Sequence, residues 1–158
     1  MPWLTILSRW IHVVSACIAL GGTFFIVVVL PVGFKILPPD LATEAHQKIR
    51  RVFKMVMHST ILLLLLSGIF NTIAAWGKYK LDPRLLHPLW GTHVLFGLIA
   101  MSIAFWVLAG RTPRKGNRMW LALNLLVLLA TVAAASTLKW ARDSATAAPN
   151  ATNGSTAP

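Results

Sequence analysis

The chain has 158 residues, of which 56% are apolar and only four are acidic, and its mean hydropathy is +0.68. This composition is typical of an integral membrane protein and leaves little chain for a soluble domain. The formal charge of +11 does not indicate nucleic-acid binding. The fifteen Lys and Arg residues lie almost wholly between and beside the apolar runs, where they would meet the lipid headgroups of a bilayer.

Four apolar runs are long enough to cross a bilayer. A hydrocarbon core of ~30 Å needs about 20 largely apolar helical residues, because no water is present there to satisfy the backbone. The runs cover residues 10–33, 55–76, 89–110 and 119–138. Their short connections make successive helices neighbours of opposite direction. We therefore expect an all-α integral membrane protein in which residues 1–142 form an antiparallel four-transmembrane-helix bundle.

The segments outside these runs are short. Helix formers after "LPPD" predict an amphipathic helix that leads into the second run, with Thr43 and Glu44 near its start. The connection "RTPRKGNR" is long enough only for a tight turn. Residues 143–158 lack apolar periodicity and are rich in Ala, Ser, Thr, Asn and Pro, which predicts a disordered C-terminal tail.

The distribution of basic residues predicts the orientation in the membrane. The connections after the first and third runs carry nine basic residues, and the opposite side carries six. The positive-inside rule then places both of these connections in the cytoplasm and both termini outside.

Small and polar residues mark the face that each helix turns toward the bundle, because small side chains let helices approach closely in lipid. At helical spacing, the first run shows His12, Ser15, Ala16, Ala19, Gly22 and Thr23, and the third shows His93, Gly97, Ala100 and Ala104. Both runs begin on the outer side and reach their histidine within about one turn. His12 and His93 are therefore expected to face each other at similar height near the outer surface.

The same comparison of depth predicts two polar layers. The outer layer holds His12, His93, Asn71 and Ser15. The inner layer holds His58, Asn124, Ser59 and Thr60, with Met55 and Met57 close in sequence.

Two neutral imidazoles on separate helices are what axial ligation of a b-type haem requires. His12 and His93 are the candidate ligands, and Gly22, Gly97 and Ala100 would leave room for the macrocycle. Arg9, Lys78 or Lys80 could meet the propionates of the haem. A second, inner haem would need a partner for His58, which only His46 could supply by folding back.

Copper is the alternative cofactor for the same residues. Imidazole suits copper in both oxidation states, and thioether and thiolate groups favour Cu(I). His12 and His93 with Cys17 could form an outer site, and Met55, Met57 and His58 an inner one, although the last three cannot all face one way on a helix.

A structural role for the histidines is the third interpretation, because an interfacial histidine can simply bond a carbonyl group or a lipid headgroup. Enzymatic chemistry by the chain itself finds little support. The four acidic residues, Asp40, Glu44, Asp82 and Asp143, all lie outside the apolar runs, and the sequence has no phosphate-binding loop or nucleophile elbow. The sequence is still compatible with a redox enzyme in which a bound haem carries out the reaction.

Two stretches resemble a known family. "LSRWIHVVSACIALGGTFFIVVVLPV" and "IRRVFKMVMHSTILLLLLSGIFN" are similar to the first two helices of CopD-like copper-resistance domains, and the similarity extends over about the first 110 residues. It implies a bundle in the cytoplasmic (inner) membrane that takes part in copper handling with a periplasmic copper carrier. It also implies ligand roles for His12, His58 and His93. CopD proteins have further helices, whereas this chain has four apolar runs.

The size of the chain is also similar to that of HemJ-type protoporphyrinogen oxidases, which hold haem through a histidine of the first helix. The basic and aromatic end of that helix is absent from "FFIVVVLPVGFKI", and His93 stands where a lysine is expected in "LWGTHVLFG". The oxidase activity is not carried over. The functions expected are thus copper or haem binding in metal transport or membrane electron transfer, a HemJ-like oxidoreductase, or a structural subunit.

Overall fold

The computed structural model describes residues 2–109 and 117–152, and 96% of it is helical. The elements in chain order are α1 (Pro2–Phe24), η1 (Phe25–Val29), α2 (Leu30–Gly33), η2 (Phe34–Ile36), α3 (Pro39–Tyr79), α4 (Pro83–Leu108) and α5 (Asn117–Thr152). The described ranges contain no strand. The all-α class expected from the sequence is therefore confirmed.

Within residues 2–109 and 117–152, four helical segments are long and apolar enough to cross a membrane, which indicates a multi-pass membrane protein. They are Trp3–Ile36, Pro39–Tyr79, Pro83–Leu108 and Arg118–Thr146. Each one contains a predicted apolar run, except that the third run extends to residue 110, which lies outside the described residues. The tight turn expected over residues 111–118 falls almost wholly outside them as well.

The first crossing segment changes its helical geometry near its end. Residues Phe25–Val29 form a π-helical turn, closed by a bond from the Leu30 N–H to the Phe25 carbonyl. Pro31 follows this turn and has no N–H to donate, and its ring would crowd the carbonyl of Val27 in a regular α-helix. The wider π-turn accommodates that proline within a continuous helical segment.

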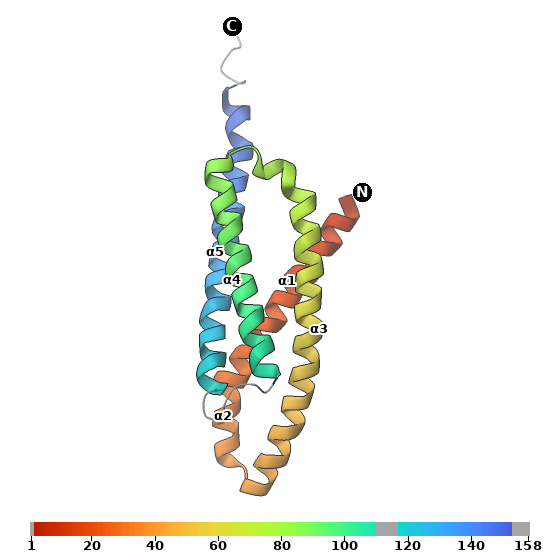
Figure 1. Cartoon of the computed structure of the whole chain (residues 1–158), viewed down its shortest axis with the longest axis vertical. Coiled ribbons are helices and arrows are strands. Elements are labelled where there is room, and N and C mark those ends of the chain that lie inside the picture. Colours follow the sequence, from red (N-terminus) through yellow and green to blue (C-terminus); the bar gives the residue numbers. More distant parts are fainter. Residues whose placement is uncertain (1, 110–116, 153–158) are drawn as a thin grey trace.

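The long helices pack chiefly as two pairs, α1 against α3 and α4 against α5. Figure 1 shows α4 and α5 side by side, while α1 lies oblique to α3. Further contacts of α1 with α5 and of α3 with α4 join the two pairs into one bundle.

Two separate apolar clusters form the core of the bundle. The first contains Ala19, Met57, Leu64, Ala104 and Leu108, from α1, α3 and α4. The second contains Ala75, Tyr79, Leu86, Leu138 and Ala141, from α3, α4 and α5. The stretch of α3 between Leu64 and Ala75, and that of α4 between Leu86 and Ala104, therefore lie between the two clusters.

Helix α3 begins well before its apolar run. Pro39 occupies the first helical position, where its missing N–H costs nothing. The negative charge of Asp40 in the first turn interacts favourably with the positive end of the helix dipole. An ion pair between Glu44 and Lys48 supports the next turn at 2.7 Å. The expected amphipathic helix is thus the first part of α3 and continues into the second run without a break.

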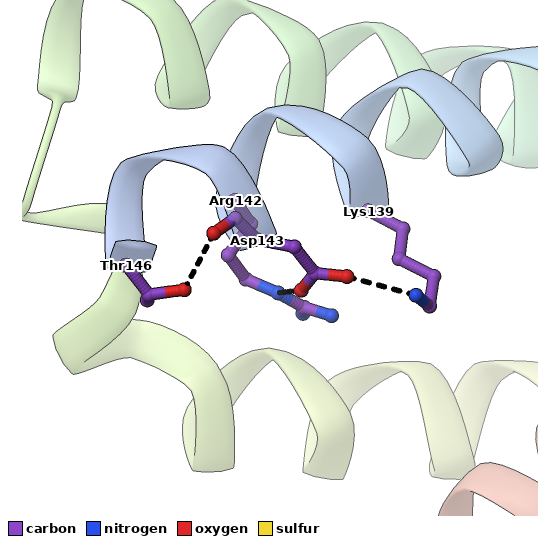
Figure 2. Close-up of polar contacts among 4 residues, drawn as sticks. All are labelled: Lys139, Arg142, Asp143 and Thr146. Atoms are coloured by element: carbon purple, nitrogen blue, oxygen red, sulfur yellow. Dashed lines mark hydrogen bonds and ion pairs between the residues drawn. The ribbon is translucent and has the colours of Figure 1, made fainter. Parts of the chain in front are cut away.

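The prediction that disorder begins at residue 143 is wrong, because α5 continues through Thr152. Side-chain contacts support the turn at 143 (Figure 2). Lys139 lies four residues before Asp143, and its Nζ atom bonds Asp143 Oδ2 at 2.8 Å, while the Thr146 hydroxyl donates to the Asp143 carbonyl. Such contacts and the alanines of this segment favour helix. Residues 153–158 of the expected tail lie outside the described residues.

Candidate two-histidine site

The two small-residue faces pack into the bundle as their spacing predicts. On α1, Ser15, Ala19 and Thr23 are buried, whereas Val13 and Val14 are exposed. On α4, Ala100 and Ala104 are buried. His12 and His93 lie on these faces and are half-buried.

The rings of His12 and His93 are neighbours. Their centroids lie 6.5 Å apart, and the ring planes are inclined by 59°. Each histidine lies ten residues beyond the first residue of its helix, which corresponds to a rise of about 15 Å. The expected juxtaposition is confirmed. However, both helices begin earlier than the predicted runs. Each ring therefore lies further from the start of its helix than the single turn that the sequence predicted.

Helix α3 holds the His12 ring through Ser67 and Gly68. His12 Nδ1 lies 2.9 Å from the Ser67 hydroxyl oxygen, and that hydroxyl donates to the Leu63 carbonyl at 2.5 Å. Since the Ser67 proton is used in this way, its oxygen accepts the bond from His12 Nδ1–H. A Cβ atom on Gly68 would lie 3.4 Å from His12 Cε1, so the ring packs directly against this glycine.

Helix α5 holds the His93 ring through its backbone. His93 Nδ1 lies 3.2 Å from the Thr131 carbonyl oxygen, which can only accept. The Thr131 hydroxyl donates to the Val127 carbonyl, four residues earlier.

These acceptors assign the same tautomer to the neutral form of each ring, with the proton on Nδ1. The lone pair of each ring then lies on Nε2, the nitrogen that commonly binds metals. Metal-binding histidines in proteins usually donate their other N–H to a carbonyl or a similar acceptor, which orients the ring and raises its basicity. Ser67, Gly68 and Thr131 were missed by the sequence reasoning. The Ser-Gly pair within the leucine-rich run is the signal that could have indicated the first two.

The rings lie in the polar stretch between the two apolar clusters. Ser67 and Gly68 follow Leu64 of the first cluster on α3, and His93 lies between Leu86 and Ala104 on α4. Asn71 follows Ser67 by one turn, and its Oδ1 atom is buried without a hydrogen-bond partner among the described residues. Asn71 therefore belongs to this polar layer, as expected.

Other predicted lining residues have different surroundings. A Cβ atom on Gly22 would meet the Phe53 ring at 3.3 Å, so this glycine accommodates Phe53 instead of lining a space between the histidines. A Cβ atom on Gly97, one turn beyond His93, would meet the Thr131 methyl group at 4.0 Å. Ser15 is buried three residues after His12. Asn124 is 1% exposed, and its Oδ1 atom has no hydrogen-bond partner within residues 2–109 and 117–152.

The residues of the expected inner site do not converge. Met57 is buried in the first apolar cluster, while Met55 and His58 are exposed. His58 bonds the Lys54 carbonyl of its own helix at 2.6 Å and contacts the edge of Phe105. This separation follows from the helix, on which consecutive residues point in different directions.

His46 and Cys17 do not complete a site either. His46 packs against Phe34, with ring centroids 5.5 Å apart, and lies twelve residues before His58 on the same helix, a rise of about 18 Å. His46 therefore does not fold back to His58, as a second, inner haem would have required. Cys17 is exposed, on a different side of α1 from buried Ser15.

Aromatic side chains gather where α3 meets α4. Trp76 stacks on His87 at 5.7 Å and contacts Tyr79 and Trp90 edge-on. The Trp90 indole donates to the Thr72 hydroxyl at 3.3 Å. Because Trp90 lies one turn before His93, this aromatic cluster stands between the two histidines and the α3–α4 connection.

The 6.5 Å between the ring centroids is close to the distance expected for two imidazoles that bind one metal from opposite sides. A metal–nitrogen bond of ~2.0 Å and a distance of ~1.1 Å from nitrogen to ring centre give a centroid separation of about 6.2 Å for a linear arrangement. Within the described part of the chain, no three His, Cys, Asp or Glu side chains lie together as a ligand set. The donors that these residues offer in one layer of the bundle are the two imidazole Nε2 atoms of His12 and His93.

The fold and site define an all-α protein with four helices capable of crossing a membrane and a pair of histidines oriented between them. Comparison with protein-family models, curated proteins and solved structures finds no match. The CopD-like and HemJ-like resemblances stay predictions.

Proposed function

We propose that this protein is a membrane protein that holds a metal centre between His12 and His93 and acts in electron transfer or metal handling. The observation that carries this proposal is the pair of rings 6.5 Å apart, each with Nδ1 bonded to an acceptor. Such an arrangement leaves two Nε2 lone pairs in one layer of the bundle.

Haem b is the cofactor that this donor set favours. Proteins hold haem iron through one or two side chains, so the two imidazoles would be enough to hold it. Bound haem would supply one-electron redox chemistry. His12 and His93 would hold the iron, and Arg9, three residues before His12, offers a cation for a propionate carboxylate.

Copper is the second candidate, favoured by the same ring separation. His12 and His93 would hold the ion through imidazole nitrogens, which suit copper. The sulfur donors that the sequence offered lie elsewhere: Met57 is in the first apolar cluster and Cys17 is exposed. Copper would therefore be held by imidazole nitrogens alone.

We further propose that the helices cross the cytoplasmic membrane in alternating directions with both termini outside. Support comes from the basic residues, since Lys48, Arg50, Arg51 and Lys54 are all exposed on the first part of α3. This orientation turns the aromatic cluster at the α3–α4 connection toward the outer interface, where Trp residues are enriched. A periplasmic copper carrier or redox protein would be the partner on that side.

The first test is the visible spectrum and metal content of the protein purified in detergent from cells supplied with haem and copper. We expect a Soret band and a sharp α band after reduction with dithionite. His12→Ala and His93→Ala should each abolish or shift this signal, because each removes one axial ligand. His58→Ala is the matched control, and it should leave the signal unchanged because His58 is exposed and bonds its own helix.

The outcomes separate the candidate functions. Copper bound without a Soret band, and lost in the His12 and His93 variants, would support the copper centre. Loss of signal in the His58 variant alone would contradict the two-histidine site. Absence of both haem and copper from the wild-type protein would favour a structural subunit whose histidines only pack.

A further inference from the structure

We propose that Ser67 is a positioning residue that sets the tautomer and orientation of His12. This inference deepens the proposed function and rests on it, because the role concerns the nitrogen that His12 presents to the metal. The Ser67 hydroxyl connects the imidazole of α1 to the peptide carbonyl of Leu63 on α3.

The hydrogen bonds around Ser67 have one consistent direction. Its hydroxyl has a single proton, which it donates to the Leu63 carbonyl at 2.5 Å, with the Leu64 carbonyl also near at 3.3 Å. Its oxygen therefore accepts from His12 Nδ1–H at 2.9 Å. Ser67 is 6% exposed, so water does not readily replace it as the acceptor.

Gly68 allows the backbone of α3 to lie close to the His12 ring. A Cβ atom at this position would lie 3.4 Å from His12 Cε1 and 3.8 Å from Nδ1. The ring thus rests against the α3 backbone at Gly68 while Ser67 holds its Nδ1–H. Two consecutive residues of α3 define both the position and the rotation of the ring.

His93 provides an internal comparison. Its Nδ1–H donates directly to the Thr131 carbonyl, an acceptor that no side-chain substitution removes. The acceptor for His12 is a side chain and can be deleted. Substitution of Ser67 should therefore affect one histidine of the pair and leave the other as an internal reference.

The chemical effect follows from the removal of the acceptor. Without it, the ring keeps only its backbone interaction with Leu64, and the His12 proton shifts toward Nε2, which carries the proton in the tautomer that predominates for free imidazole side chains in water. A proton on Nε2 occupies the lone pair that would bind the metal. In the loaded protein, loss of the hydrogen bond makes the imidazole a weaker base and stabilises the oxidised metal less.

The test begins with the apoprotein, labelled with ¹⁵N-histidine in detergent micelles. We expect His12 and His93 of the wild-type protein to give Nδ1–H tautomer signals. Ser67→Ala should shift His12 toward the Nε2–H form and leave His93 unchanged. Ser67→Thr keeps a hydroxyl and should restore the wild-type tautomer. Ser59→Ala is the matched control, since Ser59 also donates to a carbonyl of α3 but is exposed.

The second measurement uses the protein loaded with haem, or with copper if copper is the metal it binds. Ser67→Ala should raise the dissociation constant roughly 10–100-fold, the range found when residues that orient a metal-binding histidine are removed. It should also raise the midpoint potential of the bound metal. Ser67→Thr should return both quantities toward the wild-type values, and Ser59→Ala should change neither.

The inference is overturned if wild-type His12 carries its proton on Nε2, or if Ser67→Ala changes neither the tautomer nor the affinity. A tautomer that follows Ser67 in a protein that binds neither haem nor copper would contradict the proposed function and support the hydrogen-bond assignment. The apoprotein measurement thus separates the failure of one proposal from the failure of the other.

Discussion

At the scale of single residues, the buried polar side chains divide into two kinds. Ser67 is fully engaged, since its hydroxyl accepts from His12 and donates to a carbonyl. Thr23 is 0% exposed, yet its hydroxyl oxygen has no hydrogen-bond partner in the part of the chain that the structure describes. A buried hydroxyl without a partner costs free energy, because its bond to water is lost and not replaced.

Thr23→Val should therefore keep or increase stability. Valine has nearly the same shape without the hydroxyl, and we expect a gain of up to about 1 kcal/mol in the free energy of unfolding. Thermal unfolding in detergent would measure it. Thr92→Val is the control, because the Thr92 hydroxyl is exposed and bonds the Pro88 carbonyl. A clear loss of stability in Thr23→Val alone would mean that the hydroxyl has a partner in the folded protein.

At the scale of helices, two adjacent glycines of α1 have different surroundings. A Cβ atom on Gly22 would lie 3.3 Å from the Phe53 ring of α3, while one on Gly21 would have no such neighbour within 4 Å among the described residues. Gly22 thus allows α1 and α3 to approach each other beside the first apolar cluster, to which Phe53 packs. This is the use of small residues expected where helices meet in lipid.

Gly22→Val should lower the free energy of unfolding by about 1–3 kcal/mol, the usual cost of overpacking. Gly21→Val is the matched control, since it makes the same change of residue type one position earlier. Unfolding of both variants by heat or denaturing detergent would measure the difference. Equal effects of the two substitutions would contradict a specific contact of Gly22 with α3.

At the scale of the whole molecule, the bundle consists of two helix pairs with the histidines on different pairs. His12 is on α1, which packs on α3, and His93 is on α4, which packs on α5. Ser67 and Thr131 each belong to the partner helix of the same pair. Each pair therefore orients its own histidine, and the association of the pairs brings the two rings together.

The proposed orientation of this bundle can be tested by labelling in a Cys17→Ser background with a membrane-impermeant maleimide. Lys80→Cys, near the α3–α4 connection, should react in intact bacterial cells. Lys48→Cys should react only after the cells are permeabilised, because the basic first part of α3 is expected in the cytoplasm. The Cys17→Ser protein, which has no cysteine, controls for background. The opposite pattern of labelling would reverse the proposed orientation.

The sequence alone determined the helical class, the four long apolar helices and the inward faces of α1 and α4. Each of these depends on local properties: the length of apolar runs and the spacing of small residues around a helix. The meeting of His12 and His93 was also predictable, because the two residues lie equally far along helices expected to start on the same side.

Only the tertiary structure decided which neighbours these residues have. Adjacent residues of α3 have different surroundings, Met57 in the core and His58 exposed, because a helix turns by about 100° per residue and its rotation is set by its partners. Ser67 bonds His12, while Asn71 lies one turn further along the same face of α3 and its Oδ1 atom has no hydrogen-bond partner among the described residues. Gly22 lies against the Phe53 ring where α1 packs on α3. Rotation and tilt depend on packing between helices distant in sequence, which local periodicity does not encode.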